Sequence, residues 1–308
     1  MGKLKVSIII VTWNNENEIE NCINSIYCQT KKYSFEIIVV DNESKDDTVA
    51  ILKKQYPTVQ VILSGGNLGF SKANNLGINM AKGELLLFLN PDTIILSGAI
   101  DKSVDYLCQY ENYGIVSCRL LNQDFSLQPS TFRFLRADLI LLEQFNLQKY
   151  FPNSIGKYYG FFGNYNRKVD WCIGAFLLAR KNDIMKIKGF TENYFMYLED
   201  MDICYKVKKV LNKDIIYIYD AMCIHLGGAS EKQSYNNARS LRIFDSLVVF
   251  LNIYLAKDVN FYLDIYIFCY QIKKIIFSFN NLFWKSEKMK LMIDKYKKNI
   301  IYLKNKKM

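Results

Sequence analysis

The chain has 308 residues, half of them apolar, and carries 40 lysines and arginines against 30 acids. This apolar content can bury a large core, so a disordered chain is excluded, and the length fits one large domain or one domain plus an appendage. Residues 251–308 contain twelve lysines and four acids, so the excess positive charge is concentrated in the C-terminal part.

Cysteine usage and hydropathy indicate the cellular compartment. The eight cysteines form no C-x-x-C pair and most lie in apolar patterns, which favours reduced, buried thiols over a disulfide framework or a zinc site. No signal-peptide pattern precedes the first strand-like run. The longest apolar run near the C-terminus, residues 261–272, is shorter than the roughly 20 residues of a membrane span. We expect a cytoplasmic protein that is either free or peripheral on the inner face of the cell membrane.

Strands and helices alternate over the first 90 residues. Buried strands are predicted at residues 5–12, 36–40, 59–63 and 84–89, and helices at 19–27 (with Asn15 as its cap), 48–55 and 70–82. Such alternation is typical of an α/β fold with a parallel, doubly wound sheet. Right-handed crossovers would then bring the carboxyl ends of the strands to one rim.

Two of these strands end in an acid. Asp41 follows the second strand, and Asp92 follows the fourth, in LLLFLNPDT. Each aspartate has two interpretations. It is either a structural residue that shapes a turn or caps a helix, or a carboxylate at the rim that binds a ligand. The glycine turn at residues 65–70 is not G-x-G-x-x-G, and no P-loop motif occurs, so the usual dinucleotide and P-loop sites are not predicted.

Three later features carry candidate chemistry. Residues 169–180 predict one buried strand, in which Gly174 marks close backbone packing. Glu199, Asp200 and Asp202 gather at the start of a predicted helix, where acids are also favoured by the helix dipole alone. His225, the only histidine, is either a structural residue or a ligand.

Four segments carry a family resemblance. In order and spacing, VSIIIVTWNNE, EIIVVDNESKDDT, GGNLGFSKANNLGI and LLLFLNPDT resemble the amino half of a family 2 glycosyltransferase, in particular the rhamnosyltransferase-like branch of bacterial surface polysaccharide synthesis. The resemblance implies a GT-A fold, a Rossmann-like and mainly parallel sheet flanked by helices, over residues 1–250. Residues 251–308 would then form a helical, lysine-rich extension.

The resemblance also implies a nucleotide-sugar and metal site. Asp41 matches the acid that contacts the nucleotide, and Asn90-Pro91-Asp92 matches the D-x-D metal motif with asparagine at its first position. Asp92 is then the only acid of the motif to hold Mg²⁺ or Mn²⁺, with His225, in the H-x-G-G-x-S pattern that ends at Ser230, as a second ligand or diphosphate contact. The residues implied in nucleotide-sugar binding are Thr12, Trp13, Asn14, Asp41, Asn67, Gly69, Lys72, Asn90 and Asp92.

The same resemblance assigns the catalytic base to Asp200, the aspartate of the Glu-Asp pair. A sugar hydroxyl is a poor nucleophile near neutral pH, so a carboxylate must take its proton. The implied reaction is inverting transfer of a hexose from a nucleotide diphosphate sugar, dTDP-rhamnose or a UDP-sugar, to a hydroxyl of a glycan or lipid-linked acceptor. The residues implied at the acceptor or sugar are Trp171, Gly174, Ala175 and Glu199. Residues 122–166 are expected to form either a lid or acceptor wall, or a simple surface insertion.

Two rival functions and two roles for the tail stay open. A sugar nucleotidyltransferase would carry a glycine- and arginine-rich loop after the first strand, where this chain has TWNNENE. A non-catalytic membrane-surface scaffold would bind no nucleotide sugar. The basic tail is either a helical hairpin packed on the enzyme or an anchor on an anionic membrane surface. No nucleic-acid partner is expected, because lysines alone give only unspecific attraction.

Overall fold

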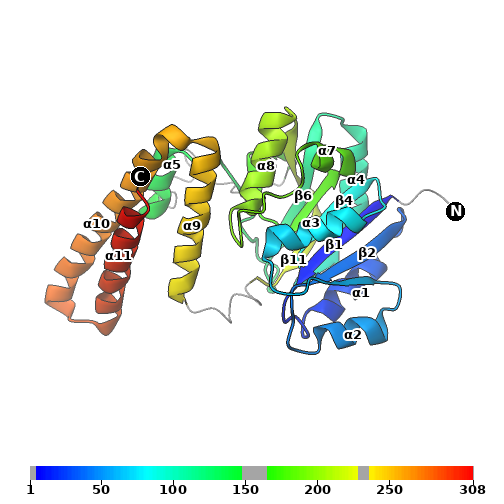
Figure 1. Cartoon of the computed structure of the whole chain (residues 1–308), viewed down its shortest axis with the longest axis horizontal. Coiled ribbons are helices and arrows are strands. Elements are labelled where there is room, and N and C mark those ends of the chain that lie inside the picture. The colour runs from blue at the N-terminus through cyan, green and yellow to red at the C-terminus, as the bar shows by residue number, and fades with distance from the viewer. Residues whose placement is uncertain (1–4, 148–164, 228–235, 308) are drawn as a thin grey trace. The chain divides into compact units, whose positions relative to one another are not determined.

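The computed structural model of the chain describes residues 5–147, 165–227 and 236–307, without the side chains of 236–238. Two compact units are formed, Met1–Phe134 with Tyr159–Gln233, and Leu135–Tyr158 with Ser234–Met308 (Figure 1). The first unit contains the sheet, and the second contains helices. The predicted extension, residues 251–308, lies within the second unit.

The first unit is built on a nine-stranded sheet. Its order is β3 (Gln60–Leu63), β2 (Phe35–Asp41), β1 (Val6–Thr12), β4 (Leu85–Leu89), β10 (Phe176–Arg180), β6 (Tyr113–Leu121), β11 (Asp214–His225) and β5 (Thr93–Leu96), with β8 (Arg167–Val169) also on β11. The first four strands in this order are parallel, as predicted. β10 runs antiparallel to β4 and β6, so the full sheet is mixed.

Helices cover both faces of this sheet (Figure 1). The side chains of β1 alternate, with Val6, Ile8 and Ile10 in one core cluster and Ile9 and Val11 in the other. The first cluster is closed by α1 (Ile19–Gln29), α2 (Thr48–Gln55) and α4 (Ala99–Gln109), the second by α3 (Phe70–Met80), α7 (Lys181–Lys186) and α8 (Glu199–Val210). The predicted α/β fold class is therefore confirmed.

Two predicted local features differ from the structure. The single strand predicted at residues 169–180 is instead the end of β8, the short β9 (Trp171–Cys172) and β10, which pair with different partners; β9 pairs with β7 (Thr131–Phe132) in a separate ribbon. Asn15 does not cap α1 with its side chain, because its Oδ1 accepts hydrogen bonds from the Thr12 hydroxyl and the Trp13 amide.

The second unit is helical, as predicted for the tail. It contains α5 (Ala137–Gln144), α9 (Asn236–Tyr254), a 3₁₀ turn (Ala256–Asp258), α10 (Val259–Trp284) and α11 (Glu287–Asn305). Its core is aromatic: the Phe244 ring lies edge-on to Tyr270 at 6.0 Å, and Tyr270 stacks on Tyr296 at 5.8 Å. Within the described ranges, no helix has the length and apolar content needed to cross a bilayer.

Candidate active site at the rim of the sheet

Asp41 lies at the carboxyl end of β2, opposite Thr12 in the register of β1. Its side chain is buried, with 4% of the residue exposed. Oδ2 accepts a hydrogen bond from the Ser44 amide at 3.1 Å, whereas Oδ1 has no hydrogen-bond partner in the described part of the chain. Leaving a buried carboxylate oxygen unpaired is costly, so Oδ1 is an acceptor suited to a donor group on a ligand.

The loops after β1 and β2 are tied to each other beside Asp41. The Asn14 amide donates to Ser44 Oγ at 2.9 Å, and Asn14 Oδ1 accepts from the Lys45 amide at 2.7 Å. Asn14 has a positive φ of 55°, a conformation that asparagine tolerates better than most residues. Trp13, next to it, is partly exposed. Thr12, Trp13, Asn14 and Asp41 are therefore brought together, as the sequence predicts for one binding site.

The start of α3 lies against the segment that leads into α8. The Phe70 amide donates to the Phe195 carbonyl at 2.9 Å, and Gly69 has a φ of +79°, where a Cβ would overlap that carbonyl oxygen. Asn67 Oδ1 accepts from the Gly69 amide at 3.2 Å and from Asn42 Nδ2 at 3.1 Å. Lys72, in the first turn of α3, is exposed. Glycine is thus required at position 69 by both backbone conformation and space.

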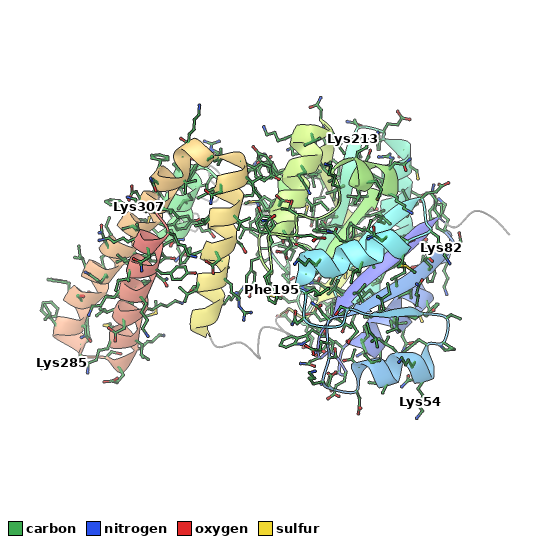
Figure 2. The ribbon with its side chains drawn as sticks, viewed as in Figure 1. Lys54, Lys82, Phe195, Lys213, Lys285 and Lys307 are labelled. Atoms are coloured by element: carbon green, nitrogen blue, oxygen red, sulfur yellow. The ribbon has the colours of Figure 1, made fainter. Side chains whose placement is uncertain are left out.

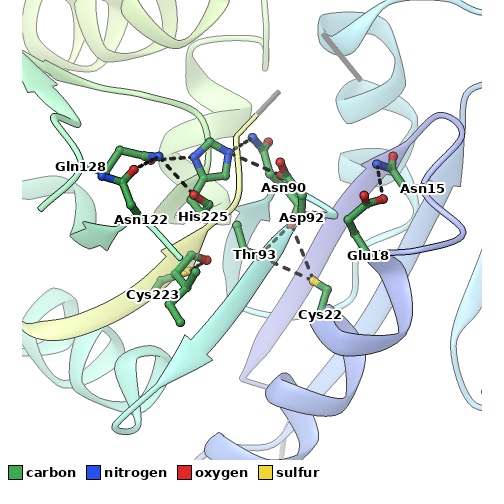
Figure 3. A network of polar contacts seen from close by, with 11 residues as sticks. Asn15, Glu18, Cys22, Asn90, Asp92, Thr93, Asn122, Gln128, Cys223 and His225 are labelled. Atoms are coloured by element: carbon green, nitrogen blue, oxygen red, sulfur yellow. Dashed lines mark hydrogen bonds and ion pairs between the residues drawn. The ribbon is translucent and has the colours of Figure 1, made fainter. Parts of the chain in front are cut away.

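Asp92 and His225 meet where β4 gives way to β5 (Figure 3). Thr93 is the register partner of His225 in the β5–β11 pair, and the Leu226 amide donates to the Asp92 carbonyl at 3.0 Å. His225 Nε2 consequently lies 3.4 Å from Asp92 Oδ1 and 3.2 Å from Asn90 Nδ2. Both side chains are largely buried, so the fold brings the two predicted metal ligands together.

This pair of side chains fits a divalent cation that takes its other ligands from a substrate. One carboxylate oxygen and one neutral imidazole nitrogen suit Mn²⁺, and Mg²⁺ is commonly held by one or two carboxylates with water and phosphate oxygens. In residues 5–147, 165–227 and 236–307, no group of three or more His, Cys, Asp or Glu side chains is placed to hold a metal. Among the described residues, Asp92 and His225 would be the protein ligands, and the substrate and water would supply the others.

Asp200 is held by backbone amides at the same rim. β10 starts opposite the end of β4, and the Asn90 amide donates to the Ala175 carbonyl at 3.1 Å. The Gly174 amide donates to Asp200 Oδ2 at 3.2 Å, and the Met201 amide donates to Oδ1 at 2.8 Å. Gly174 and Ala175 therefore link the end of β4, three residues before Asp92, to the carboxylate of Asp200.

Hydrogen bonding distinguishes the two acids of the Glu-Asp pair. Glu199 is buried, its Oε2 has no hydrogen-bond partner in the described residues, and burial together with the nearby Asp200 raises its pKa to about 8. Burial raises the pKa of Asp200 to about 6, against the opposing effect of the two backbone amides. The two amides favour the ionised form of Asp200, which is the form that can accept a proton.

Asp202 has a different environment. It is fully buried and accepts hydrogen bonds from the Thr191 hydroxyl at 2.7 Å and the Tyr194 hydroxyl at 3.3 Å, with Lys206 Nζ at 3.7 Å. These contacts fix the first turn of α8 to the segment before it.

Comparison with known proteins identifies the family. The model of "Glycosyl transferase family 2" matches residues 7–174, more than half of the chain. The chain belongs to this family.

The relatives of this family 2 glycosyltransferase include two rhamnosyltransferases. Rhamnosyltransferase WbbL of Escherichia coli is 28% identical over 212 residues, covering 66% of this chain and 76% of WbbL. The N-acetylglucosaminyl-diphospho-decaprenol L-rhamnosyltransferase of Mycobacterium tuberculosis is 25% identical over 214 residues, covering 64% of this chain and 68% of its own. The predicted resemblance to the rhamnosyltransferase-like branch is confirmed.

A solved structure agrees in fold with the glycosyltransferase. The mannosyltransferase PcManGT from Pyrobaculum calidifontis, solved in complex with GDP-Man and Mn²⁺, superposes with a TM-score of 0.53 at 19% identity. The alignment covers 80% of this chain and 63% of the mannosyltransferase. The GT-A architecture is thus shared between the two proteins.

The remaining predicted site residues of the glycosyltransferase are less closely tied to the rim. The Trp171 ring stacks on Phe132 at 4.6 Å, and its Nε1 donates to the Arg133 carbonyl at 2.9 Å. Ser230, with Gly228, lies outside the described residues, as do residues 148–164 of the predicted acceptor wall. Gln128, which the sequence motifs do not single out, contacts His225.

Proposed function

We propose that this glycosyltransferase carries out inverting transfer of a hexose from a nucleotide diphosphate sugar, dTDP-rhamnose or a UDP-sugar, to a hydroxyl of a glycan or lipid-linked acceptor in surface polysaccharide synthesis. The similarity to two rhamnosyltransferases supports the sugar class. The observation that carries the proposal is the convergence at one rim of an unpaired Asp41 oxygen, the Asp92–His225 pair and Asp200.

The nucleotide would bind at the ends of β1 and β2. Asp41 Oδ1 is the acceptor for a donor on the ribose or base, because it is buried without a partner in the described residues. The loop of Thr12, Trp13 and Asn14, which the hydrogen bonds of Asn14 to Ser44 and Lys45 hold in place, would form a wall of the nucleotide site beside Asp41. On the other side, Asn67 and Gly69 fix the start of α3, whose exposed Lys72 offers positive charge to the diphosphate.

Asp92 and His225 would hold Mn²⁺ or Mg²⁺ with Asn90 beside them. When bound, such an ion supplies positive charge that stabilises the leaving diphosphate. The chain's own contribution is to keep the two ligand atoms within reach of one ion, through the β5–β11 pairing that joins Thr93 to His225.

Asp200 would act as the base. The acceptor oxygen forms its bond to the anomeric carbon while the bond from that carbon to the diphosphate oxygen breaks, and the hydroxyl proton passes to Asp200. A single displacement of this kind inverts the anomeric configuration. The amides of Gly174 and Met201 hold both oxygens of Asp200 and leave lone pairs to accept the proton. Protonated Glu199 would orient the acceptor.

A thermal-shift panel tests this function. UDP, dTDP and GDP sugars are each added with and without Mn²⁺, and one nucleotide is expected to raise the melting temperature, more strongly with the metal, because it binds only the folded state. Pyrophosphate release from a nucleoside triphosphate would instead support a sugar nucleotidyltransferase. No shift with any donor would support a non-catalytic scaffold.

We further propose that the helical unit binds an anionic membrane surface, which would make the enzyme peripheral on the inner face of the membrane. Large apolar side chains at the end of α10 are exposed, with 72% of Leu282, 67% of Phe283 and 70% of Trp284 accessible. Lys285 lies at the turn between α10 and α11, at the opposite end of this hairpin from Lys307 (Figure 2). Apolar side chains beside lysines are the pattern of interfacial binding.

Vesicle flotation tests the membrane proposal. Phe283→Ser with Trp284→Ser is expected to abolish binding to vesicles of phosphatidylglycerol and phosphatidylcholine, whereas Val210→Ser, which changes an equally exposed apolar residue of the sheet unit, is expected to leave it intact. Wild-type protein that does not float, but forms dimers that the double substitution disrupts, would show that this surface meets a second copy instead.

A further inference from the structure

Gln128 contacts the imidazole of His225 on the side away from Asp92 (Figure 3). It lies after β6, and 97 residues separate it from His225 in the sequence. Gln128 Oε1 is 2.8 Å from His225 Nδ1, and Gln128 Nε2 lies 3.1 Å from the His225 carbonyl oxygen and 3.1 Å from Asn122 Oδ1. The Gln128 side chain thus forms hydrogen bonds with both the ring and the backbone of His225.

These contacts determine which end of the Gln128 amide faces the ring. An amide nitrogen only donates and an amide oxygen only accepts. Nε2 lies between two carbonyl oxygens, so the nitrogen must be on that side and the oxygen must face His225 Nδ1. Since Oε1 cannot donate, the proton of this hydrogen bond is on Nδ1, and in the neutral ring Nε2 then carries a free lone pair.

That lone pair points at a carboxylate. His225 Nε2 is 3.4 Å from Asp92 Oδ1, and neither atom carries a proton in this state. Two acceptors that face each other at this distance are unfavourable unless a cation or a further donor lies between them. Asn90 Nδ2, at 3.2 Å from Nε2, donates a hydrogen bond to this nitrogen in the Nδ1–H form. A divalent ion would satisfy both acceptors at once.

We propose that Gln128 is a positioning residue that fixes His225 as the Nδ1–H tautomer and so directs the Nε2 lone pair to the metal site. The inference rests on the proposed function for its metal, but the tautomer itself is a property of the metal-free protein. Residues that orient a ligating histidine through its second nitrogen typically change metal affinity about 10- to 100-fold when they are replaced.

The single histidine makes the tautomer directly measurable. In untagged protein labelled with ¹⁵N-histidine, at a pH well above the ordinary histidine pKa of about 6.5, two-bond ¹H–¹⁵N spectra report one imidazole. The unprotonated nitrogen is expected to couple strongly to both ring carbon-bound protons, which identifies it as Nε2. A protonated Nε2 in the wild-type protein would overturn the proposal.

Three variants separate orientation from folding. Gln128→Leu removes the acceptor and is expected to shift the ring toward the Nε2–H form. It is also expected to weaken Mn²⁺ binding about tenfold, as measured by the broadening of the histidine signals in a Mn²⁺ titration. Gln128→Glu keeps an acceptor and is expected to keep the Nδ1–H tautomer. The matched control is Gln123→Leu, at an exposed glutamine of the same segment, which is expected to behave as wild type.

The outcomes distinguish this inference from the proposed function. An unchanged tautomer in folded Gln128→Leu protein would overturn the role of Gln128, whatever the metal does. A second outcome is that the wild type has the Nδ1–H tautomer, Gln128→Leu loses it, and Mn²⁺ broadens the histidine signals of neither protein. This outcome would support the positioning role of Gln128 and overturn the metal assignment. Circular dichroism of each variant verifies that it is folded.

Discussion

Replacing the two acids of the Glu-Asp pair separately tests which one is the base. Asp200→Asn removes a carboxylate with a pKa of about 6, so we expect kcat to fall about 10²- to 10⁴-fold, the usual contribution of a general base. Glu199→Gln replaces the second acid by its neutral isostere, and burial, which raises the pKa of Glu199, already favours the neutral form at this position. That variant is expected to keep its activity within a few-fold.

The pH profile of the wild type supplies the magnitude. The raised pKa of Asp200, about 6, places the acid limb of the kcat/KM profile near that pH, so kcat/KM is expected to fall by up to about tenfold for each pH unit below it. The assay measures nucleoside diphosphate release at saturating Mn²⁺, so that loss of metal at low pH does not enter. An Asp200→Asn enzyme that keeps wild-type turnover, or a Glu199→Gln enzyme as impaired as Asp200→Asn, would refute the assignment.

Four further predictions concern binding and stability. Asp41→Ala is expected to weaken nucleotide binding about 10- to 100-fold by calorimetry, because a charged acceptor contributes about 1.5–3 kcal/mol, and unchanged affinity would remove Asp41 from the site. Asp92→Asn is expected to abolish the extra thermal shift that Mn²⁺ gives with the donor; a retained shift would place the metal elsewhere. Gly69→Ala is expected to lower the free energy of unfolding in urea by about 1–3 kcal/mol or more, because φ is +79° there, and wild-type stability would contradict the strain. The folded-state pKa of Glu199, about 8, lies above its ordinary value of 4.5, so the free energy of unfolding of the wild type is expected to fall as pH rises between these two values. Glu199→Gln is expected to flatten this dependence of stability on pH. An equally steep dependence in the variant would mean that another group causes it.

The first half of the fold was predictable because its signals are local. The β-branched run of β1 and the apolar run of β4 stop at polar residues, and each helix between the strands shows its own periodicity. The parallel pairing then follows from crossover handedness. The positions of Asp41 and Asp92 at the rim were predictable for the same reason, since the end of a strand is visible in the sequence.

Long-range pairing explains what local patterns did not predict. The apolar run at 169–180 is divided because its parts pair with β11, β7 and β4, partners that no local pattern names. Asparagine is a common helix cap, yet Asn15 Oδ1 accepts hydrogen bonds from the Thr12 hydroxyl and the Trp13 amide instead. Gln128 gave no signal at all, because a loop glutamine becomes informative only when its distant histidine is placed beside it.

The Gly174 amide that holds Asp200 belongs to the main chain, so every residue except proline would supply the same donor. A change of side chain at position 174 would therefore keep this hydrogen bond to Asp200. Position 174 also has room for a small side chain, because a Cβ there would stand at ordinary contact distance, 3.5 Å from the Phe70 ring and 3.7 Å from the Asp200 Cβ. The support that this segment gives to the proposed base therefore does not depend on which small residue stands at position 174.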